Sequence, residues 1–315
     1  MRYTEFCGRQ TAVIALGTMD FGGKIDQGRA FEYMDAYMDI GGNFIDTARM
    51  YGDFTANVWG GSEEIIGKWM EARRNRGDII LSTKGAHPKQ KGIGRLSRDA
   101  IMEDMQQSLD ALKCDHVDIY WLHRDDESRP VRDIMESLTE ICEKGYAKYA
   151  GVSNWSTRRI IEANECAEKH GLIKIYANQP QFSLAPQYLV EDPTLRQMDG
   201  NMYAMHMKNM TPCVAFSSQS KGYLAKMAQY GEAALNDKVK RRFHTPENIA
   251  LLERVKAVSG ETGLSAAAIA LAWLTNQPFP TFPIAGVSKM EHFDAIKEAG
   301  DAVLTKNQLD FLRTL

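Results

Sequence analysis

The chain places an acid and a phenol five residues apart, at the point where an apolar stretch ends. In NFIDTARMYG, Asp46 closes the apolar stretch and Tyr51 follows in a polar segment. Lys84 in LSTKG and His123 in VDIYWLHRDD close two further apolar stretches. A carboxylate, a phenol, an ammonium group and an imidazole are groups with which proteins move protons. We therefore take Asp46, Tyr51, Lys84 and His123 as the candidate catalytic residues.

Each of these four residues has an ordinary explanation when it is taken alone. A buried lysine beside a buried acid is usually a structural pair, and a single buried histidine is usually a core residue. Four such residues at corresponding positions are much harder to explain as separate structural residues, because each buried polar group costs desolvation free energy unless the groups contact one another. In a shared site, we expect Lys84 to lower the pKa of the Tyr51 phenol while Asp46 holds the ammonium group in place.

The elements that must position these residues follow an alternating pattern. Short apolar stretches alternate with segments of helical periodicity, which is typical of parallel strands joined by crossover helices. Ser62 is predicted as a helix N-cap, Thr245-Pro246 as a helix start, and Thr305 with Gln308 as a capping box. The expected strands cover residues 13–18, 43–46, 79–84, 117–123, 149–153, 173–178, 214–217 and 281–286.

This pattern predicts one domain over residues 1–315, a (β/α)8 TIM barrel with an N-terminal β-hairpin and two extra helices. The interval between the seventh and eighth strands is the longest, so we place an insertion with an extra helix there. A doubly wound sheet is the alternative, and evenly spaced units favour the barrel. The C-terminal ends of barrel strands carry the chemistry, and Asp46, Lys84 and His123 fall at such ends.

The bulk composition excludes several classes of partner. The 315 residues are 44% hydrophobic and 25% charged, and the formal net charge of -3 offers no basic surface to nucleic acid or an anionic membrane. We expect no membrane span and no leader segment. The five cysteines show no CxxC spacing, which argues against a metal site or a disulfide framework and favours the cytoplasm. We therefore expect a small-molecule substrate and leave the oligomeric state open.

The sequence resembles the aldo-keto reductase superfamily over almost its whole length. The resemblance rests on the stretches NFIDTARMYG, SEEIIGKWM, LSTKG, VDIYWLHRDD, GVSNW, NQPQFSL and PIAGVSKMEHF. It implies a tetrad of Asp46, Tyr51, Lys84 and His123, in which Tyr51 donates the proton and His123 orients the carbonyl oxygen. It also implies a nicotinamide cofactor bound without a Rossmann fold, and the chain has no Gly-x-Gly-x-x-Gly fingerprint.

The resemblance further implies which residues hold the nicotinamide half of the cofactor. Ser153, Asn154 and Gln179 match positions that hold the carboxamide, and Phe216 matches an aromatic residue that stacks on the ring. The segment that follows, with Ser217, Gln219 and Ser220, would offer hydroxyls and backbone amides to the pyrophosphate. Taken singly, these residues are also consistent with strand-end caps, a core phenylalanine and a serine-rich turn.

The adenosine end departs from the family pattern. Members commonly carry an arginine and a Glu-Asn pair after the eighth strand, where this chain has His292, Ala295 and Ile296. We expect Lys226, Gly286, Ser288 and His292 to bind the cofactor here, and NADPH to be preferred, with NADH as the alternative. The basic residues Lys238, Lys240, Arg241 and Arg242 could compensate, although a solvated charged face is the favoured interpretation.

The implied activity is the reduction of aldehyde, ketone or sugar-like carbonyls. Trp59 and Trp121 are expected to line the substrate pocket, although either could be a packing residue, and His87 is interpreted as a loop residue. Two alternatives stay open. One is a nicotinamide-binding redox sensor or auxiliary subunit with little turnover, and the other is an enzyme that works mainly in the direction of alcohol or sugar oxidation.

Overall fold

The computed structural model describes residues 1–53, 58–88 and 94–313, and its centre is a closed barrel of parallel strands. This confirms the predicted barrel and excludes the doubly wound sheet, because β12 pairs with β3 and closes the ring. Around the barrel the strands are β3 (Ala15–Gly17), β4 (Phe44–Asp46), β7 (Ile80–Gly85), β8 (Val117–Leu122), β9 (Ala147–Ser153), β10 (Ala177–Gln179), β11 (Cys213–Ala215) and β12 (Thr281–Gly286).

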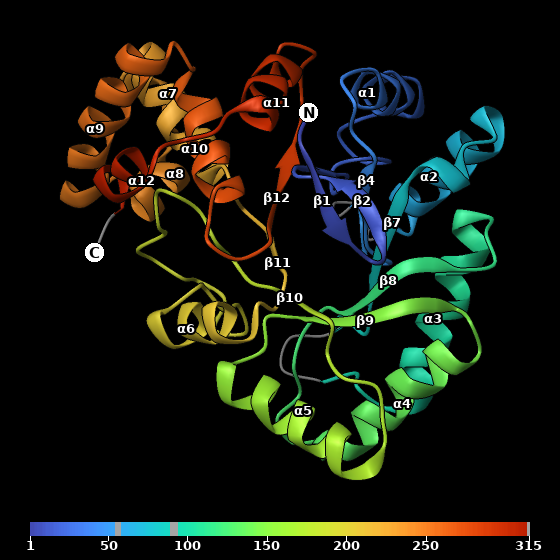
Figure 1. Cartoon of the computed structure of the whole chain (residues 1–315). Helices are drawn as coiled ribbons and strands as arrows, with labels where there is room; N and C mark the ends of the chain where they lie inside the picture. The colour runs from blue at the N-terminus through green and yellow to red at the C-terminus, as the bar shows by residue number, and fades with distance from the viewer. Residues whose placement is uncertain (54–57, 89–93, 314–315) are drawn as a thin grey trace.

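Each barrel strand is followed along the chain by a helix that covers the outside of the barrel. Figure 1 shows these helices arranged around the strands. They are α1 (Gln27–Asp39), α2 (Gly61–Arg73), α3 (Arg98–Leu112), α4 (Val131–Glu143), α5 (Thr157–His170), α6 (Gly200–Asn209), α10 (Ala266–Thr275) and α11 (His292–Asp301). Strand residues therefore face either these helices or the barrel interior, so the strands are buried on both faces.

The described residues contain more additional helices than the two that the sequence predicts. Between β11 and α10 lie α7 (Tyr223–Tyr230), α8 (Asp237–Phe243) and α9 (Pro246–Thr262), and α12 (Lys306–Leu312) follows α11. α7 and α8 have 8 and 7 residues, too few to repeat an apolar periodicity. In the described part of the chain, no single helix is long and apolar enough to cross a membrane, although α9 and α10 reach that composition together across a 91° bend.

Two of the three predicted helix starts are confirmed. Thr245 caps α9 with proline at its first position, and Thr305 and Gln308 form the capping box of α12. The prediction for Ser62 is wrong, because α2 begins one residue earlier and Gly60, with a φ of 85°, occupies its N-cap. The Ser62 hydroxyl instead donates to the carbonyl of Thr18 at 3.0 Å, which ties α2 to the loop after β3.

An N-terminal hairpin, also as predicted, closes one end of the barrel. It consists of β1 (Tyr3–Phe6) and β2 (Arg9–Ala12) in antiparallel pairing. Phe6 is fully buried in the barrel interior, with its ring centroid 5.2 Å from that of Phe44 and 4.7 Å from that of Phe282. Because the hairpin seals this end, access to the barrel interior is left to the C-terminal ends of the strands.

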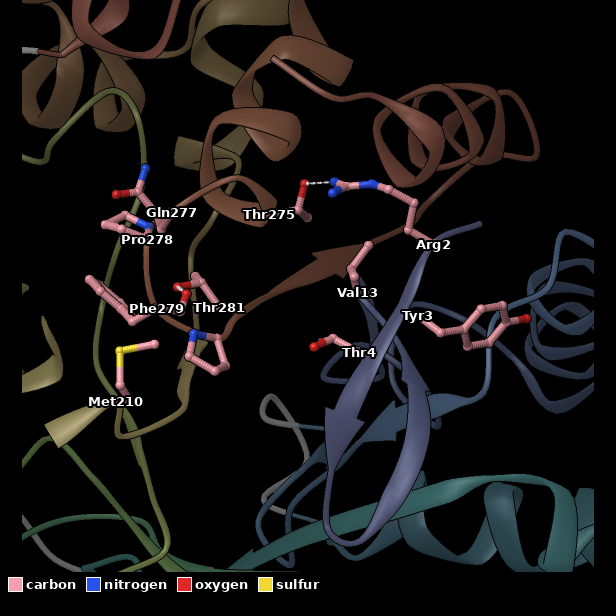
Figure 2. Close-up of a pocket in the computed structure, with 11 residues that line it drawn as sticks. Arg2, Tyr3, Thr4, Val13, Met210, Thr275, Gln277, Pro278, Phe279 and Thr281 are labelled. Carbon is pink, nitrogen blue, oxygen red and sulfur yellow. Dashed lines mark hydrogen bonds between the residues drawn. The ribbon is translucent and has the colours of Figure 1, made fainter. Parts of the chain in front are cut away.

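The hairpin is fixed to the far end of the chain and borders a surface groove. The backbone N–H of Arg2 donates to the carbonyl of Gly300 at 2.8 Å, and its guanidinium donates to Thr275 at 2.8 Å. Figure 2 shows this second bond at the edge of a groove of about 540 Å³, which Val13 and Phe279 also line. The groove lies beside the start of β12, at the opposite end of the barrel from Asp46 and Lys84.

Candidate active site

Three of the four predicted catalytic residues stand at the C-terminal ends of neighbouring strands. Asp46 is the last residue of β4, Lys84 is the next-to-last residue of β7, and His123 follows β8 directly. β4 pairs with β7, and β7 pairs with β8, so the three side chains enter the same end of the barrel. Tyr51, in the loop after β4, completes the group that the sequence places together.

The amino group of Lys84 is the centre of this cluster. Its Nζ donates to Oδ2 of Asp46 at 2.5 Å, to the carbonyl of Thr47 at 2.7 Å and to the Tyr51 hydroxyl at 3.3 Å. Lys84 and Asp46 are both 1% exposed. Burial alone would lower the pKa of Lys84, but the charge of Asp46 and the contact with Tyr51 raise it above its usual value. Lys84 is therefore held charged beneath the phenol.

The phenol of Tyr51 differs from the expectation in its acidity. Burial raises the pKa of Tyr51 above its usual value of 10.0 and outweighs the opposing effect of Lys84, and Asp46 raises the pKa further. The expected lowering by Lys84 is present, but it is smaller than the cost of desolvating a phenolate. Tyr51 consequently remains protonated at neutral pH, which is the state that a proton donor requires.

His123 lies beside this phenol as a neutral imidazole. Its ring is edge-on to that of Tyr51 with centroids 5.9 Å apart. Burial, followed by the charges of His87, Arg124 and Lys84, lowers the pKa of His123 well below its usual value. Its Nδ1 is buried without a hydrogen bond among the described residues, whereas Nε2 is not fully buried. A neutral ring with one accessible nitrogen is suited to hydrogen bonding with a carbonyl oxygen.

Sequence reasoning missed His87, which lies within the site. Its ring is edge-on to His123 with centroids 4.8 Å apart and to Trp59 with centroids 6.5 Å apart. Its Nδ1 lies 2.9 Å from the carbonyl of Pro88, so Nδ1 carries the proton if this hydrogen bond forms. Burial lowers the pKa of His87 to about 4, so the ring is neutral. The available signal was its position three residues after Lys84.

The two tryptophans predicted for the substrate pocket occupy different environments. Trp59, which ends the short strand β6 (Val58–Trp59), is partly exposed and contacts His87 at the mouth of the site. Trp121 has no exposed surface and packs in the barrel interior with Phe6 and Phe282. This position fits the packing interpretation of Trp121, so we retain Trp59 alone as a pocket residue.

The three residues predicted to hold the carboxamide are all brought to this end of the barrel. Gln179, the last residue of β10, donates from Nε2 to Oδ1 of Asp46 at 3.1 Å, which leaves its Oε1 as a free acceptor. Ser153 donates to the carbonyl of Gln179 at 2.8 Å. Asn154 donates to Ser153 and to the carbonyl of His123, and it accepts from the backbone of Arg196. Gln179 thus has a polar atom available for a ligand, whereas Ser153 and Asn154 hold its backbone in place through their hydrogen bonds.

The segment after β11 has a backbone suited to an anion. Ser217, Ser220 and Lys221 have φ values of 53°, 49° and 56°, so three residues of this segment adopt the left-handed conformation that occurs in anion-binding turns. Ser220 itself is a correction to the expectation. Its amide donates to Ser217 and its hydroxyl to Ala185, so it has no donor left for a phosphate in this conformation. Gln219 remains available, and Phe216 is partly exposed, as a stacking residue must be.

The adenosine end carries a small basic group. Two lysines, Lys226 and Lys289, lie close enough to His292 for their charges to lower its pKa, after the larger effect of burial. The backbone N–H of Ser288 donates to Nδ1 of His292 at 3.3 Å, which fixes Nδ1 as an unprotonated acceptor. Gly286 is exposed and precedes this turn. Ile296, at a family Asn position, is buried, so it faces the core.

Three of the four basic residues of α8, all except Lys238, are paired with acids in this structure. Lys240 lies 2.9 Å from Glu232, and Arg241 lies 3.9 Å from Glu191, which also pairs with Arg242. This arrangement favours the interpretation as a solvated charged face.

Comparisons with known proteins agree with this geometry. A model of the Aldo/keto reductase family matches residues 13–315. A probable voltage-gated potassium channel subunit beta of Arabidopsis thaliana is 28% identical, over 94% of this chain and 89% of its own. An aryl-alcohol dehydrogenase [NADP(+)] of Phanerodontia chrysosporium is 28% identical, over 97% and 83%. An uncharacterized oxidoreductase of Bacillus subtilis is also 28% identical, over 100% and 96%.

Proposed function

Because the chain belongs to the aldo/keto reductase family, we propose that it reduces aldehydes and ketones with hydride from a nicotinamide and a proton from Tyr51. Family membership makes it an NAD(P)H-dependent oxidoreductase. The observation that carries the finer proposal is the phenol of Tyr51, which lies 3.3 Å from a lysine that is itself ion-paired to Asp46. We assign the reaction to the cytoplasm, since the cysteines are free thiols.

Tyr51 is the proposed general acid. The nicotinamide supplies hydride to the carbonyl carbon when it is bound. The proton on the Tyr51 oxygen passes to the carbonyl oxygen, and the phenolate that remains is stabilised by the hydrogen bond from Lys84. Asp46 acts through Lys84 by holding its ammonium group, so it positions the lysine without contacting the substrate.

His123 is proposed to orient the carbonyl oxygen. Because its pKa is far below neutrality, it offers a neutral N–H beside the phenol and does not compete as the acid. Its ring lies edge-on to Tyr51 with centroids 5.9 Å apart, which is close enough for both groups to contact the same carbonyl oxygen.

The residues present fit a nicotinamide cofactor. The free Oε1 of Gln179 can accept from the carboxamide N–H, and the backbone of residues 217–219 in the left-handed turn can offer amides to a pyrophosphate. Lys226 and Lys289 supply the cationic surroundings that a 2'-phosphate requires, and His292 lies beside them as a neutral imidazole at neutral pH. NADPH is therefore the proposed cofactor, and NADH is the alternative.

A second candidate function is a nicotinamide-dependent sensor or auxiliary subunit. It is favoured by the similarity to a protein named as a probable potassium channel subunit beta. The hydrogen-bonded chain of Asp46, Lys84 and Tyr51, with the ring of His123 beside the phenol, favours turnover instead.

The test is a panel of aldehydes, ketones and sugars with NADPH and NADH, followed at the nicotinamide absorbance. We expect steady turnover of an activated aromatic aldehyde, and oxidation of the matching alcohol with NADP⁺ measures the reverse direction. Tight cofactor binding with one slow oxidation and no steady turnover across the panel would support the sensor function and refute the reductase.

A further inference from the structure

Arg124, the residue after His123, brings a positive charge to the mouth of the site. Its Nη1 donates to the carbonyl of His123 at 2.9 Å, and its Nε donates to the hydroxyl of Thr194 at 3.0 Å. Thr194 belongs to the segment that follows β10, so the guanidinium bridges the end of β8 and that segment. The side chain is 12% exposed, and the two hydrogen bonds hold its charge in a fixed place.

This charge is only partly neutralised. In the part of the chain that the structure describes, one carboxylate lies within ion-pair distance of Arg124, that of Asp192 at 3.7 Å from Nη2. That separation is longer than a hydrogen bond, and the Asp192 side chain is 46% exposed. At this distance Asp192 still interacts with Arg124, since it raises the pKa of the guanidinium against the larger lowering by burial, but it occupies Nη2 only loosely. A guanidinium has five N–H donors, so Arg124 keeps donors for a ligand.

Arg124 adjoins the reacting groups, because it follows His123 directly in the chain and donates to the carbonyl of that residue at 2.9 Å. Arg124 acts on Tyr51, His123 and His87 alike, since its charge shifts the pKa of each of them downward. The other cation at this centre, Lys84, is already paired with Asp46. Arg124 is thus positioned to meet a negative charge on a molecule whose carbonyl contacts Tyr51.

We propose that Arg124 binds a carboxylate of the substrate, so that the preferred substrates are carbonyl compounds that also carry an acid group. This inference rests on the proposed function, because it concerns the same mouth. One guanidinium matches the single negative charge of a carboxylate and can bind its two oxygens through parallel N–H donors. Asp192 competes for the same nitrogen and limits the affinity.

The test compares acids with their uncharged methyl esters. The two pairs are 4-carboxybenzaldehyde with methyl 4-formylbenzoate, and 4-oxobutanoate with methyl 4-oxobutanoate, each measured as kcat/KM. We expect wild type to prefer the acid of at least one pair. In Arg124→Met the acid-to-ester ratio should fall on the order of 10- to 100-fold, mainly through KM, as expected for a charged hydrogen bond.

Matched variants separate this role from a structural one. If Arg124 only supported the neighbouring segment, its loss would lower both rates and leave their ratio unchanged. Arg124→Lys should give an intermediate ratio, because it keeps the charge but loses the planar donors. Asp192→Asn should raise the ratio, and Arg132→Met, on the exposed face of α4, should leave it unchanged.

Equal kcat/KM for acid and ester in wild type, or a ratio that Arg124→Met does not alter, would overturn the inference while leaving the reductase function in place. Absence of turnover with all four aldehydes would count against the proposed function instead. In that case, calorimetric binding of benzoate in the presence of NADP⁺ decides the inference. It should be weaker in Arg124→Met than in wild type, and equal affinity would refute it.

Discussion

Replacing Lys84 by methionine should damage both activity and stability, for separable reasons. The substitution removes the three hydrogen bonds of Nζ, to Asp46, to the Thr47 carbonyl and to Tyr51. Methionine fills a similar volume, so the loss of charge dominates the effect. Tyr51 then lacks the group that stabilises its phenolate, and carbonyl reduction should fall on the order of 10²- to 10⁴-fold.

The stability change follows from what Asp46 keeps. Removing one partner of a buried ion pair costs roughly 3–5 kcal/mol. Asp46 still accepts hydrogen bonds from Ser82 at 2.7 Å and from Gln179 at 3.1 Å, which places the expected loss at the lower end, about 3 kcal/mol. Such a loss is a large fraction of the roughly 5–15 kcal/mol that holds a typical domain folded.

Urea unfolding at neutral pH measures this loss, and a double variant tests its cause. Asp46→Asn in the Lys84→Met background removes the unpaired charge, so it should recover about 1–3 kcal/mol of stability without recovering activity. Lys113→Met is the matched control, because its ion pair with Glu71 is exposed and should contribute less than about 1 kcal/mol. A Lys84→Met protein as stable as wild type, or a double variant no more stable than the single one, would refute this account of the pair.

The remaining predictions concern Tyr51, Glu63 and His292. Tyr51→Phe should lower reduction on the order of 10²- to 10⁴-fold with NADPH affinity unchanged by fluorescence titration, and near-normal turnover would transfer the acid role to His123. Glu63 is fully buried on α2, and burial raises its pKa from the usual 4.5 to about 7. Its contribution to the free energy of unfolding is therefore fully present below pH 4.5, where the carboxyl is neutral in both states, and is lost as pH rises through 7. Glu63→Gln should therefore become more stable relative to wild type between pH 4.5 and 8, by about 3 kcal/mol at most, and a difference independent of pH in urea unfolding would contradict this. His292, whose pKa is lowered, should strengthen NADPH binding only as pH falls below its usual 6.5, and His292→Arg should tighten NADPH but not NADH in calorimetry at pH 8. Equal binding of both cofactors by both proteins at every pH would exclude His292 from the phosphate site.

The barrel could be predicted because buried parallel strands and their helices leave strong local patterns. Strand 117–123 was found almost residue for residue, since every residue of β8 except Asp118 is apolar. Strand 173–178 was predicted to begin too early, and β10 covers only Ala177–Gln179, because the side-chain pattern of a segment does not mark where strand pairing begins. Helix α6 (Gly200–Asn209) was not predicted, because its ten residues mix polar and apolar side chains without a clear apolar face.

In the site too, the features that follow from strand topology could be predicted, and those that depend on tertiary packing could not. The convergence of Asp46, Lys84 and His123 follows from barrel topology, so strand-end positions alone predict it. The raised pKa of Tyr51 cannot be predicted from strand-end positions, because it depends on how deeply the loop after β4 is buried. Ser220 shows the same limit, since its donors are taken by partners that only the folded turn defines. Whether the tetrad and cofactor residues act as assigned stays a prediction.

The bond between Arg2 and Gly300 has a consequence for biosynthesis, because it joins positions 298 residues apart. A ribosome adds roughly 5–20 residues per second, so roughly 15–60 s pass between the synthesis of Arg2 and that of its partner Gly300. During that time Phe6 has no barrel to enter, and its ring is an exposed apolar group on a nascent chain. The contact between Arg2 and α11 can therefore form only after helix α11 has been synthesised and released from the ribosome.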